Sequence, residues 1–287
     1  MHESYLIKKS NDFNLEHTFQ CGQCFRWNKG QDGSYIGVFK NNVIKAQETE
    51  SEIFFEGITD GNIKDILIDY FDLDNDYTAI KNKLSKIDEN MKNSINYGYG
   101  IRILHQDVWE TLISFIISAN NNIPRIKAII ERLSKKYGKE IIFEGKKYYT
   151  FPTPQELKDV KVEEYRALGM GFRDKRIYET VKMVLAGTID LYKLENEPTP
   201  IVREKLLECP GVGPKVADCI MLFSLKKYDV FPIDVWVRRV MNELYIKKDD
   251  EIMVNKKELE TLAKEKYGSL AGLAQQYLFY WRREKGA

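Results

Sequence analysis

The chain has 287 residues and carries 44 Lys and Arg residues against 43 Asp and Glu residues, a formal net charge of +1. This length can bury a large core without disulfides or metals, and no apolar run is long enough to span a bilayer. The first residues, "MHESYLIKKSNDF", lack the apolar run of a signal peptide, so the four cysteines are expected to be reduced thiols in a cytoplasmic protein.

Charge is distributed unevenly along the chain. Residues 48–90 hold 12 acidic against 4 basic side chains, whereas residues 120–140 hold 6 basic against 2 acidic and residues 166–182 hold 5 against 2. Solvated helix faces explain most charge runs of this kind. The separation is also compatible with a basic face that meets a polyanion and an acidic end that points away from it.

Short aromatic and β-branched runs fill residues 24–58 and are broken at Asp32-Gly33 and Asn41-Asn42, which predicts a meander of antiparallel strands. The pair Cys21 and Cys24 beside this segment resembles half a zinc site or a redox pair. No second Cys or His pair stands at a finger-like spacing, so we expect both thiols to be packing residues.

Residues 72–76, "DLDND", begin like a calcium loop. Tyr77 stands where such a loop needs a glycine, and Lys83 stands where it needs a bidentate glutamate. The sequence therefore excludes an EF-hand.

From about residue 62 the periodicity becomes helical, and no further strand is predicted. In "HQDVWETLISFIISA" the apolar residues have helical spacing, with Asp107 as N-cap and Glu110 three residues later. Further helices are predicted at about 123–137, 154–168, 173–186, 200–208, 214–226, 235–246, 256–266 and 270–283.

Strands followed by helices predict an α+β protein. We expect a small antiparallel-sheet N-terminal domain with flanking helices over residues 1–98. A larger all-helical domain is expected over residues 99–287, with a helix-hairpin-helix at about residues 200–226.

The connection inside this helix-hairpin-helix reads "CPGVGPKVADC" at residues 209–219. Gly211 and Gly213 can take positive φ, and without side chains there the backbone N–H groups can approach a phosphate, helped by the N-terminus of the next helix. A glycine C-cap between two packed helices is the simpler explanation, but the Pro-Gly-Val-Gly pattern is more specific. It favours binding of the DNA backbone by Gly211, Val212 and Gly213, a contact that does not depend on base sequence.

Lys215 and Cys219 are four residues apart, so they lie on one face at the start of the second helix. A cation is disfavoured at a helix N-terminus, which suits a lysine that must offer a free amine. Asp234 follows Pro232 and precedes a helical run, so it is a predicted N-cap. One helix and a short connection separate Lys215 from Asp234, and the two side chains are expected to face one cleft.

These residues resemble the helix-hairpin-helix glycosylase superfamily, and in particular the 8-oxoguanine DNA glycosylases, over nearly the whole chain. Six segments resemble family motifs in the family's order: "CGQCFRW", "GIRILHQDVWETLISFIISANNNIPRI", "LGMGFRDKR", "CPGVGPKVADCI", "FPIDVW" and "LAGLAQQYLF". Several motifs in register are far more specific than one hairpin.

The resemblance implies a base excision repair enzyme that needs no cofactor and acts as a monomer on double-stranded DNA containing 8-oxoguanine, in the cytoplasm on the nucleoid. Lys215 would attack C1′ of the damaged nucleotide, expel the base and form a Schiff base, and β-elimination would then nick the strand. Asp234 would stabilise the cationic sugar. Lysine suits Schiff-base chemistry, and a carboxylate can stabilise developing positive charge.

The resemblance also implies a pocket for an extruded base. The carbonyl of Gly22 would accept the N7 hydrogen that 8-oxoguanine has and guanine lacks. Gln275 would hydrogen-bond the base, Phe279 and Cys219 would contact its two faces, and Pro232 would line the pocket.

Four residues would act on the DNA around the pocket. Asn120 would fill the gap left by the base, Arg125 and Arg173 would read the orphaned cytosine, preferred as the opposite base, and Phe172 would be a wedge.

The chain departs from the family pattern at two of these positions. Phe172 stands where Tyr is frequent, which removes one hydroxyl contact but keeps the stacking. Trp236 stands where eukaryotic members use a phosphate-contacting histidine, and its indole N–H could still donate to a phosphate. No metal site is expected with certainty. The backbone carbonyls of Leu207, Cys209 and Val212 could hold a cation that bridges to phosphate, and a C-terminal tail without cysteines cannot hold the iron-sulfur cluster of other superfamily members.

Two alternatives remain open from the residues. A non-catalytic hairpin module that binds DNA would need the Gly-x-Gly turn but neither Lys215 nor Asp234. A monofunctional glycosylase for alkylated or mispaired bases would activate water with the aspartate and would need no lysine nucleophile.

Overall fold

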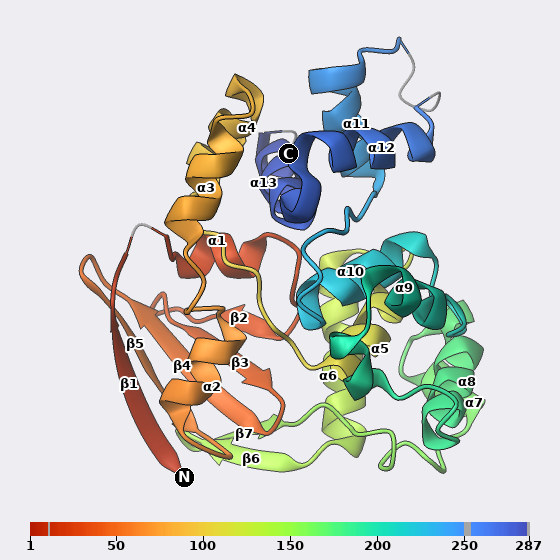
Figure 1. Ribbon diagram of the computed structural model, residues 1–287. Helices are drawn as coiled ribbons and strands as arrows, with labels where there is room; N and C mark the ends of the chain where they lie inside the picture. The colour runs from red at the N-terminus through yellow and green to blue at the C-terminus, as the bar shows by residue number, and fades with distance from the viewer. Residues whose placement is uncertain (11, 250–253, 286–287) are drawn as a thin grey trace.

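The computed structural model describes residues 1–10, 12–249 and 254–285. An antiparallel sheet with strand order β1-β5-β4-β3-β2 forms the N-terminal part, seen at the lower left of Figure 1. Its strands are β1 (His2–Lys8), β2 (Trp27–Lys29), β3 (Tyr35–Phe39), β4 (Asn42–Glu48) and β5 (Glu52–Ile58). The predicted meander over residues 24–58 is therefore confirmed, with β1 added at its far edge.

One face of this sheet is covered by α2 (Ile63–Tyr70), and the space between them is filled with aromatic side chains. The rings of Phe19 and Trp27 are stacked at 4.1 Å, and those of Phe39 and Tyr70 at 3.9 Å. Aromatic pairs at these separations add stability beyond the area that they bury. Phe19 of α1 (Leu15–Gln20) belongs to this core, so the start of the loop that follows α1 is anchored to the sheet.

The larger C-terminal part is helical and surrounds a second hydrophobic core. Its α-helices are α5 (Val108–Ser118), α6 (Ile123–Tyr137), α7 (Val162–Ala167), α8 (Asp174–Leu185), α9 (Thr199–Leu207), α10 (Pro214–Ser224), α11 (Val235–Met241), α12 (Lys256–Tyr267) and α13 (Ala271–Lys285). Short 3-10 helices lie at η1 (Gly171–Arg173), η2 (Leu191–Asn196) and η5 (Gly268–Leu270), and a π turn, η3 (Asn242–Ile246), extends α11. The α+β architecture with a sheet part before a helical part is confirmed, and Asp107 caps α5 by accepting from the N–H of Glu110.

The expectation that strands end at residue 58 was wrong. A second, two-stranded sheet consists of β6 (Glu140–Phe143) and β7 (Lys146–Tyr149), which are joined by a tight turn. Both turn residues have positive φ, 48° at Glu144 and 71° at Gly145, as two-residue hairpin turns require. The predicted helix at 154–168 is also too long, because only α7 in its second half is helical.

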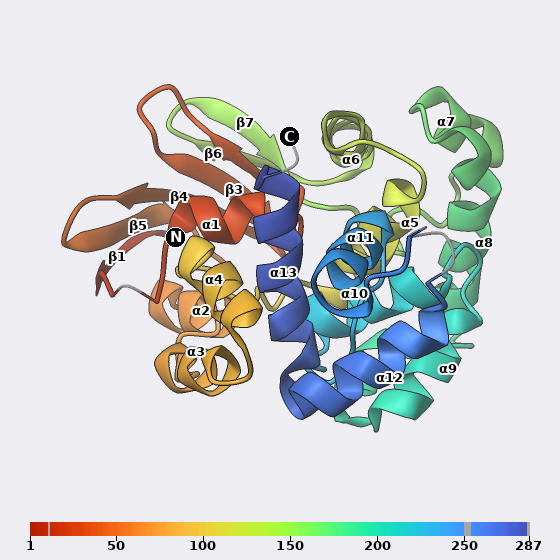
Figure 2. The ribbon, with the colours of Figure 1, turned by 90° about the horizontal axis from the view of Figure 1, so that it is seen from above.

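The two parts of the chain meet along α13. Helices α3 (Tyr77–Ser85) and α4 (Glu89–Tyr97) continue the N-terminal part, and α4 packs against α13 from one side while α11 packs against it from the other. Figure 2 shows α13 running between α1 and α4 on one flank and α10 and α11 on the other. A site beside α13 can therefore draw side chains from both ends of the sequence.

Candidate active site

A narrow pocket lies at this junction and collects most of the predicted catalytic and base-binding residues. Its lining residues are Cys21, Gly22, Phe115, Lys215, Cys219, Phe223, Pro232, Asp234, Gln275, Gln276 and Phe279. They come from the loop after α1, from α5, from α10, from the segment before α11 and from α13. The cavity is about 30 Å³, room for about two water molecules, and it is partly open to solvent.

The helix-hairpin-helix places the start of α10 beside this pocket. Gly211 has φ of 88°, and a Cβ there would lie 2.8 Å from Cδ of Arg176, so only glycine fits the turn. Gly213 does not take the positive φ that we considered; its φ is −96° and it is the N-cap of α10. A Cβ at Gly213 would meet no atom within 4 Å, so this glycine leaves the helix N-terminus open to an approaching phosphate.

Lys215 and Cys219 lie one turn apart on α10, and both line the pocket. The ammonium nitrogen of Lys215 is 5.1 Å from the ring centre of Phe115, within the range of a cation–π contact. Burial raises the pKa of the Cys219 thiol to about 11, although the Lys215 ammonium acts in the opposite direction. Because this thiol stays protonated near neutral pH, Cys219 is not a thiolate nucleophile and is suited to packing against a base.

Asp234 has a structural bond in addition to its place in the pocket. Its carboxylate accepts a hydrogen bond of 2.8 Å from the N–H of Val237 and so caps α11, as predicted. The cap fixes the carboxylate at the pocket wall, where its charge also acts on the Cys219 thiol. The structure thus brings Lys215 and Asp234 to one pocket.

The loop that carries Gly22 is held rigidly by its neighbour Gln23. The Gln23 amide donates to the carbonyls of Thr18 and Arg102 at 2.9 and 2.7 Å, and its oxygen accepts from the N–H of Leu104 at 2.8 Å. These bonds tie the loop to the segment that leads into α5. Gln23 was not predicted as a site residue, because two of its partners, Arg102 and Leu104, are about 80 residues away in the sequence.

Gly22 and Phe279 lie against each other at the pocket. Gly22 has φ of 80°, and a Cβ at this position would lie 3.1 Å from Cε1 of Phe279 and 3.4 Å from Nη1 of Arg283. The Arg283 guanidinium lies 5.3 Å from the Phe279 ring centre and donates to the carbonyl of Gln20. Arg283 thus connects the Phe279 ring to the Gly22 loop, a contact that the sequence did not reveal.

Gly22→Ala tests the role of this close approach. For the activity that the sequence resemblance implies, we expect the variant to lose about tenfold or more in the rate at which the damaged base is excised, because alanine rarely adopts the positive φ of this position and its methyl group would crowd Phe279. Cleavage at a preformed abasic site should be nearly unchanged, because no base has to enter. Single-turnover rates on the two duplexes measure both; an equal loss on both duplexes contradicts a role confined to the base.

The residues predicted to act on the surrounding DNA lie around the N-terminus of α6 and around η1. Asn120 is exposed with φ of 50°, and Phe172 is 54% exposed, with its ring near the guanidinium groups of Arg173 and Arg176 at 4.3 and 5.1 Å. An exposed ring flanked by cations suits contact with a nucleic acid. Arg125 is also exposed, at the start of α6. The roles of these residues stay predictions.

Arg173 is buried, unlike Arg125. Its guanidinium donates to the carbonyls of Ala119, Asn120 and Met170, the last two at 2.9 and 3.1 Å. It therefore fixes the backbone of the Asn120 turn, and reading a cytosine would have to use a donor that these bonds leave free.

Two further predicted contacts lie near the pocket and the hairpin. Trp236 is half-buried on α11, and the Arg239 guanidinium lies 5.3 Å from its ring centre. Of the three carbonyls proposed for a cation, that of Cys209 accepts from the N–H of Val212 at 3.0 Å. A phosphate contact by Trp236 and a cation at Leu207, Cys209 and Val212 both stay predictions.

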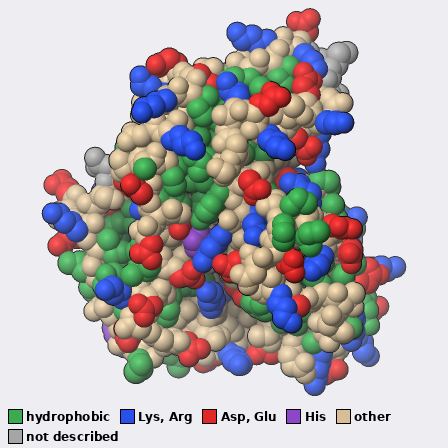
Figure 3. Space-filling model, in the orientation of Figure 1, with side chains coloured by type: hydrophobic (Ala, Val, Ile, Leu, Met, Phe, Trp, Pro, Cys, Tyr) green, Lys and Arg blue, Asp and Glu red, His purple; other side chains and the backbone are tan. Residues whose placement is uncertain are grey.

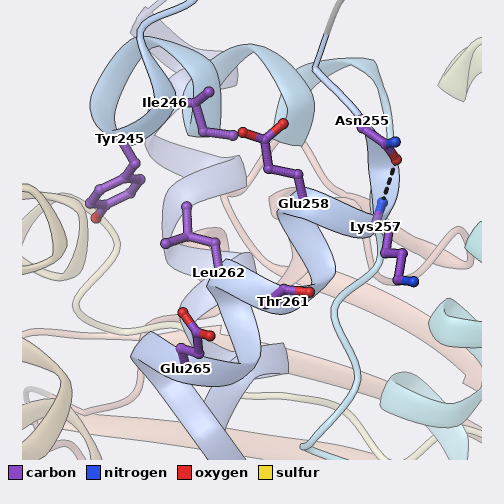
Figure 4. Close-up of a pocket in the computed structure, with 8 residues that line it drawn as sticks. All are labelled: Tyr245, Ile246, Asn255, Lys257, Glu258, Thr261, Leu262 and Glu265. Atoms are coloured by element: carbon purple, nitrogen blue, oxygen red, sulfur yellow. Dashed lines mark hydrogen bonds between the residues drawn. The ribbon is translucent and has the colours of Figure 1, made fainter.

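Other surface features lie apart from this pocket. On the face drawn in Figure 3, Lys and Arg side chains are interspersed with Asp and Glu side chains, so that face has no large field of one sign. A cavity of about 670 Å³ opens beside α12 and η3, away from all predicted site residues, and Figure 4 shows the residues that line it. Both charged and apolar side chains line that cavity, among them Glu258, Leu262 and Glu265.

Within residues 1–10, 12–249 and 254–285, no group of three or more His, Cys, Asp or Glu side chains is placed to hold a metal ion. The four cysteines, Cys21 and Cys24 included, are buried and free. No helix of the described part is long and apolar enough to cross a membrane.

A plain DNA-binding module does not need a pocket with an amine and a carboxylate beside a hairpin whose glycines leave a helix N-terminus open to an approaching phosphate. It fits an enzyme that draws one base out of the duplex and acts on it. The fold and the pocket together define a helix-hairpin-helix DNA glycosylase.

Comparison with known proteins agrees with this class. Residues 5–112 match the family "8-oxoguanine DNA glycosylase, N-terminal domain", and residues 113–267 match the "HhH-GPD superfamily base excision DNA repair protein" family. The N-glycosylase/DNA lyase of Saccharomyces cerevisiae is 35% identical over 284 residues, which are 89% of this chain and 73% of the yeast protein.

Two solved structures are similar over almost the full length. The Clostridium acetobutylicum 8-oxoguanine glycosylase/lyase, solved with double-stranded DNA containing cytosine opposite 8-oxoG, is 41% identical with a TM-score of 0.93, covering 100% of this chain and 99% of that chain. MBOgg1, solved with a low affinity DNA ligand, is 45% identical with a TM-score of 0.94, covering 99% and 96%. The chain belongs to the 8-oxoguanine DNA glycosylases of the HhH-GPD superfamily.

Proposed function

We propose that this base excision repair glycosylase/lyase removes 8-oxoguanine, preferably from opposite cytosine, through a Schiff base on Lys215 and then nicks the strand by β-elimination. The observation that carries this proposal is that Lys215, Asp234, Gly22 and Phe279 line one pocket, although they come from four separate segments of the chain. A protein that only binds DNA has no need for this combination.

The covalent step balances as follows. The lone pair of the Lys215 amine forms a bond to C1′ while the bond between C1′ and N9 breaks, and the base leaves with that electron pair and takes up a proton. The nitrogen loses a proton, the sugar ring opens at O4′, and a protonated Schiff base results. Loss of a proton from C2′ then expels the 3′ phosphate and nicks the strand.

Asp234 would lower the barrier of the first step. Positive charge develops on the sugar as the base departs, and a fixed carboxylate at the pocket wall stabilises it without having to reorganise. The cap bond to Val237 holds the carboxylate in place before the nucleotide arrives. The cap uses one carboxylate oxygen of Asp234, and the other oxygen would face the sugar.

Recognition of the damaged base would rest on a single hydrogen. 8-oxoguanine carries a hydrogen on N7, whereas guanine has a lone pair there. The carbonyl of Gly22 would accept that hydrogen and would repel the lone pair of guanine, and a closed pocket makes an unpaired carbonyl costly. Gln275, which is buried on α13, would bond the opposite edge of the base.

The protein is expected to act as a monomer on DNA in the cytoplasm, at the nucleoid. Its four cysteines are buried and free, which suits a reducing compartment. Duplex DNA supplies the surface that completes the site, so a second copy of the chain is not needed.

Single-turnover excision from four duplexes, with 8-oxoguanine opposite each normal base, tests the proposal. We expect base release and strand nicking to be fastest opposite cytosine, because the family resemblance assigns Arg125 and Arg173 to the orphaned cytosine. A duplex with guanine in place of 8-oxoguanine is the control and should not be cut. Cleavage of the guanine duplex at a comparable rate contradicts the proposal.

A further inference from the structure

A second glutamine on α13 lines the base pocket and has no role so far. Gln276 is only 2% exposed, and its neighbour Gln275 is 4% exposed. Among the residues that the structure describes, neither amide oxygen has a hydrogen-bond partner. Buried polar groups in folded proteins are nearly always paired, so an unpaired amide at a pocket wall points to a partner that the protein itself does not supply.

The close approach of α13 to α10 is what brings Gln276 to the pocket. Gly272 stands one turn before Gln276, and a Cβ there would lie 2.5 Å from a methyl carbon of Leu222 on α10. The N–H of Gly272 donates to the carbonyl of Tyr228 at 2.8 Å, which fixes the start of α13. Gln276 is thus held at the pocket by packing and is not a side chain free to move into solvent.

The hydrogen-bonding groups of 8-oxoguanine fit two buried amides. The base has three donor positions, the N1 hydrogen, the 2-amino group and the N7 hydrogen, and each needs an acceptor once it leaves water. The Gly22 carbonyl accounts for N7 and the Gln275 oxygen for N1. The 2-amino group, with its two hydrogens, is still without an acceptor, and the Gln276 oxygen is a buried acceptor that can take one of them.

We propose that Gln276 is a specificity residue whose amide oxygen accepts a hydrogen bond from the 2-amino group of the extruded base. This inference rests on the proposed function and adds to it a preference for oxidised purines that carry an amine at C2. Gln276 touches the base and takes no part in bond breaking.

Two substrates that differ only at C2 test this role. One duplex contains 8-oxoguanine opposite cytosine, and the other contains 8-oxohypoxanthine, in which a hydrogen replaces the 2-amino group. Single-turnover excision rates are measured for the native protein and for Gln276→Met, which keeps the volume but removes the amide. The weaker pairing of 8-oxohypoxanthine with cytosine affects both proteins equally and cancels when their rate ratios are compared.

We expect the ratio of the 8-oxoguanine rate to the 8-oxohypoxanthine rate to be about tenfold higher in the native protein than in Gln276→Met, the factor that one neutral hydrogen bond supplies. The ratio falls in the variant because only 8-oxoguanine excision slows. An unchanged ratio in the variant or an equal loss on both substrates overturns the proposal.

Two controls keep the outcome unambiguous. Thermal unfolding of Gln276→Met, measured beside the rates, shows whether the variant is folded. Arg282→Met changes the same helix at a side chain that pairs with Glu243 at 2.9 Å outside the pocket, and should keep the native ratio. If the native protein does not excise 8-oxoguanine at all, the proposed function is wrong. If it does, but the rate ratio is unchanged in Gln276→Met, only the proposed role of Gln276 is wrong.

Discussion

Lys215→Gln should abolish base excision and strand nicking. The nitrogen that we propose forms the covalent bond is then an amide without a reactive lone pair, and loss of a required nucleophile typically lowers the rate by about 10³-fold or more. The fold should be unaffected, because Lys215 is half-buried at the start of α10 and glutamine has a similar length and helix propensity. Thermal unfolding and duplex binding measured beside the rates separate lost chemistry from lost structure.

Lys205→Gln is the matched control. This lysine is in the last turn of α9, on the other side of the hairpin, and its nearest carboxylate is Glu197 at 3.8 Å. The same change of charge there should leave the rate of excision within about twofold, since an exposed pair of this kind contributes little. Substantial excision by Lys215→Gln, with Lys205→Gln equal to the native protein, rules out Lys215 as the nucleophile.

Asp234→Asn should lower the rate of base excision by about 10²-fold to 10³-fold, the usual effect of removing one electrostatic contact to a transition state. Asparagine keeps the cap on α11, because its amide oxygen can still accept from the N–H of Val237, so the melting temperature should hardly change. Asp234→Ala removes both roles and should also cost about 1 kcal/mol of stability.

Asp76→Asn provides the comparison for Asp234→Asn. Asp76 caps α3 by accepting from the N–H of Ala79 at 2.9 Å, and it lies outside the pocket. Both changes replace a capping carboxylate by an amide, but only the change at Asp234 should slow excision. Similar excision rates in the two variants show that the charge at Asp234 has no part in the reaction.

The sequence predicted what depends on short-range spacing. Lys215 and Cys219 had to share a face of one helix because they are four residues apart, and Asp234 had to be near the start of α11 because it is a capping residue before a helical run. Both expectations are confirmed by the pocket and by the cap. The strand meander was similarly marked by its turn residues.

The missed features depend on contacts between distant segments. Strand β1 pairs with β5, about 50 residues further on, and no turn links them. The hairpin of β6 and β7 turns at Glu144-Gly145. This polar turn is a weaker sequence signal than the helical periodicity of the segments before and after it. Gln276 and Arg283 resemble ordinary helix residues, and only the packing of α13 against α10 and the Gly22 loop places them at the site.

The most direct test of the central claim is to find where the DNA is attached. Borohydride is added while the protein acts on duplex DNA containing 8-oxoguanine opposite cytosine, which reduces a Schiff base to a stable amine. The trapped complex is then digested and the modified peptide identified by mass spectrometry. We predict a sugar adduct on Lys215 in the peptide that begins α10; no trapped complex, or an adduct on a different residue, contradicts the proposed mechanism.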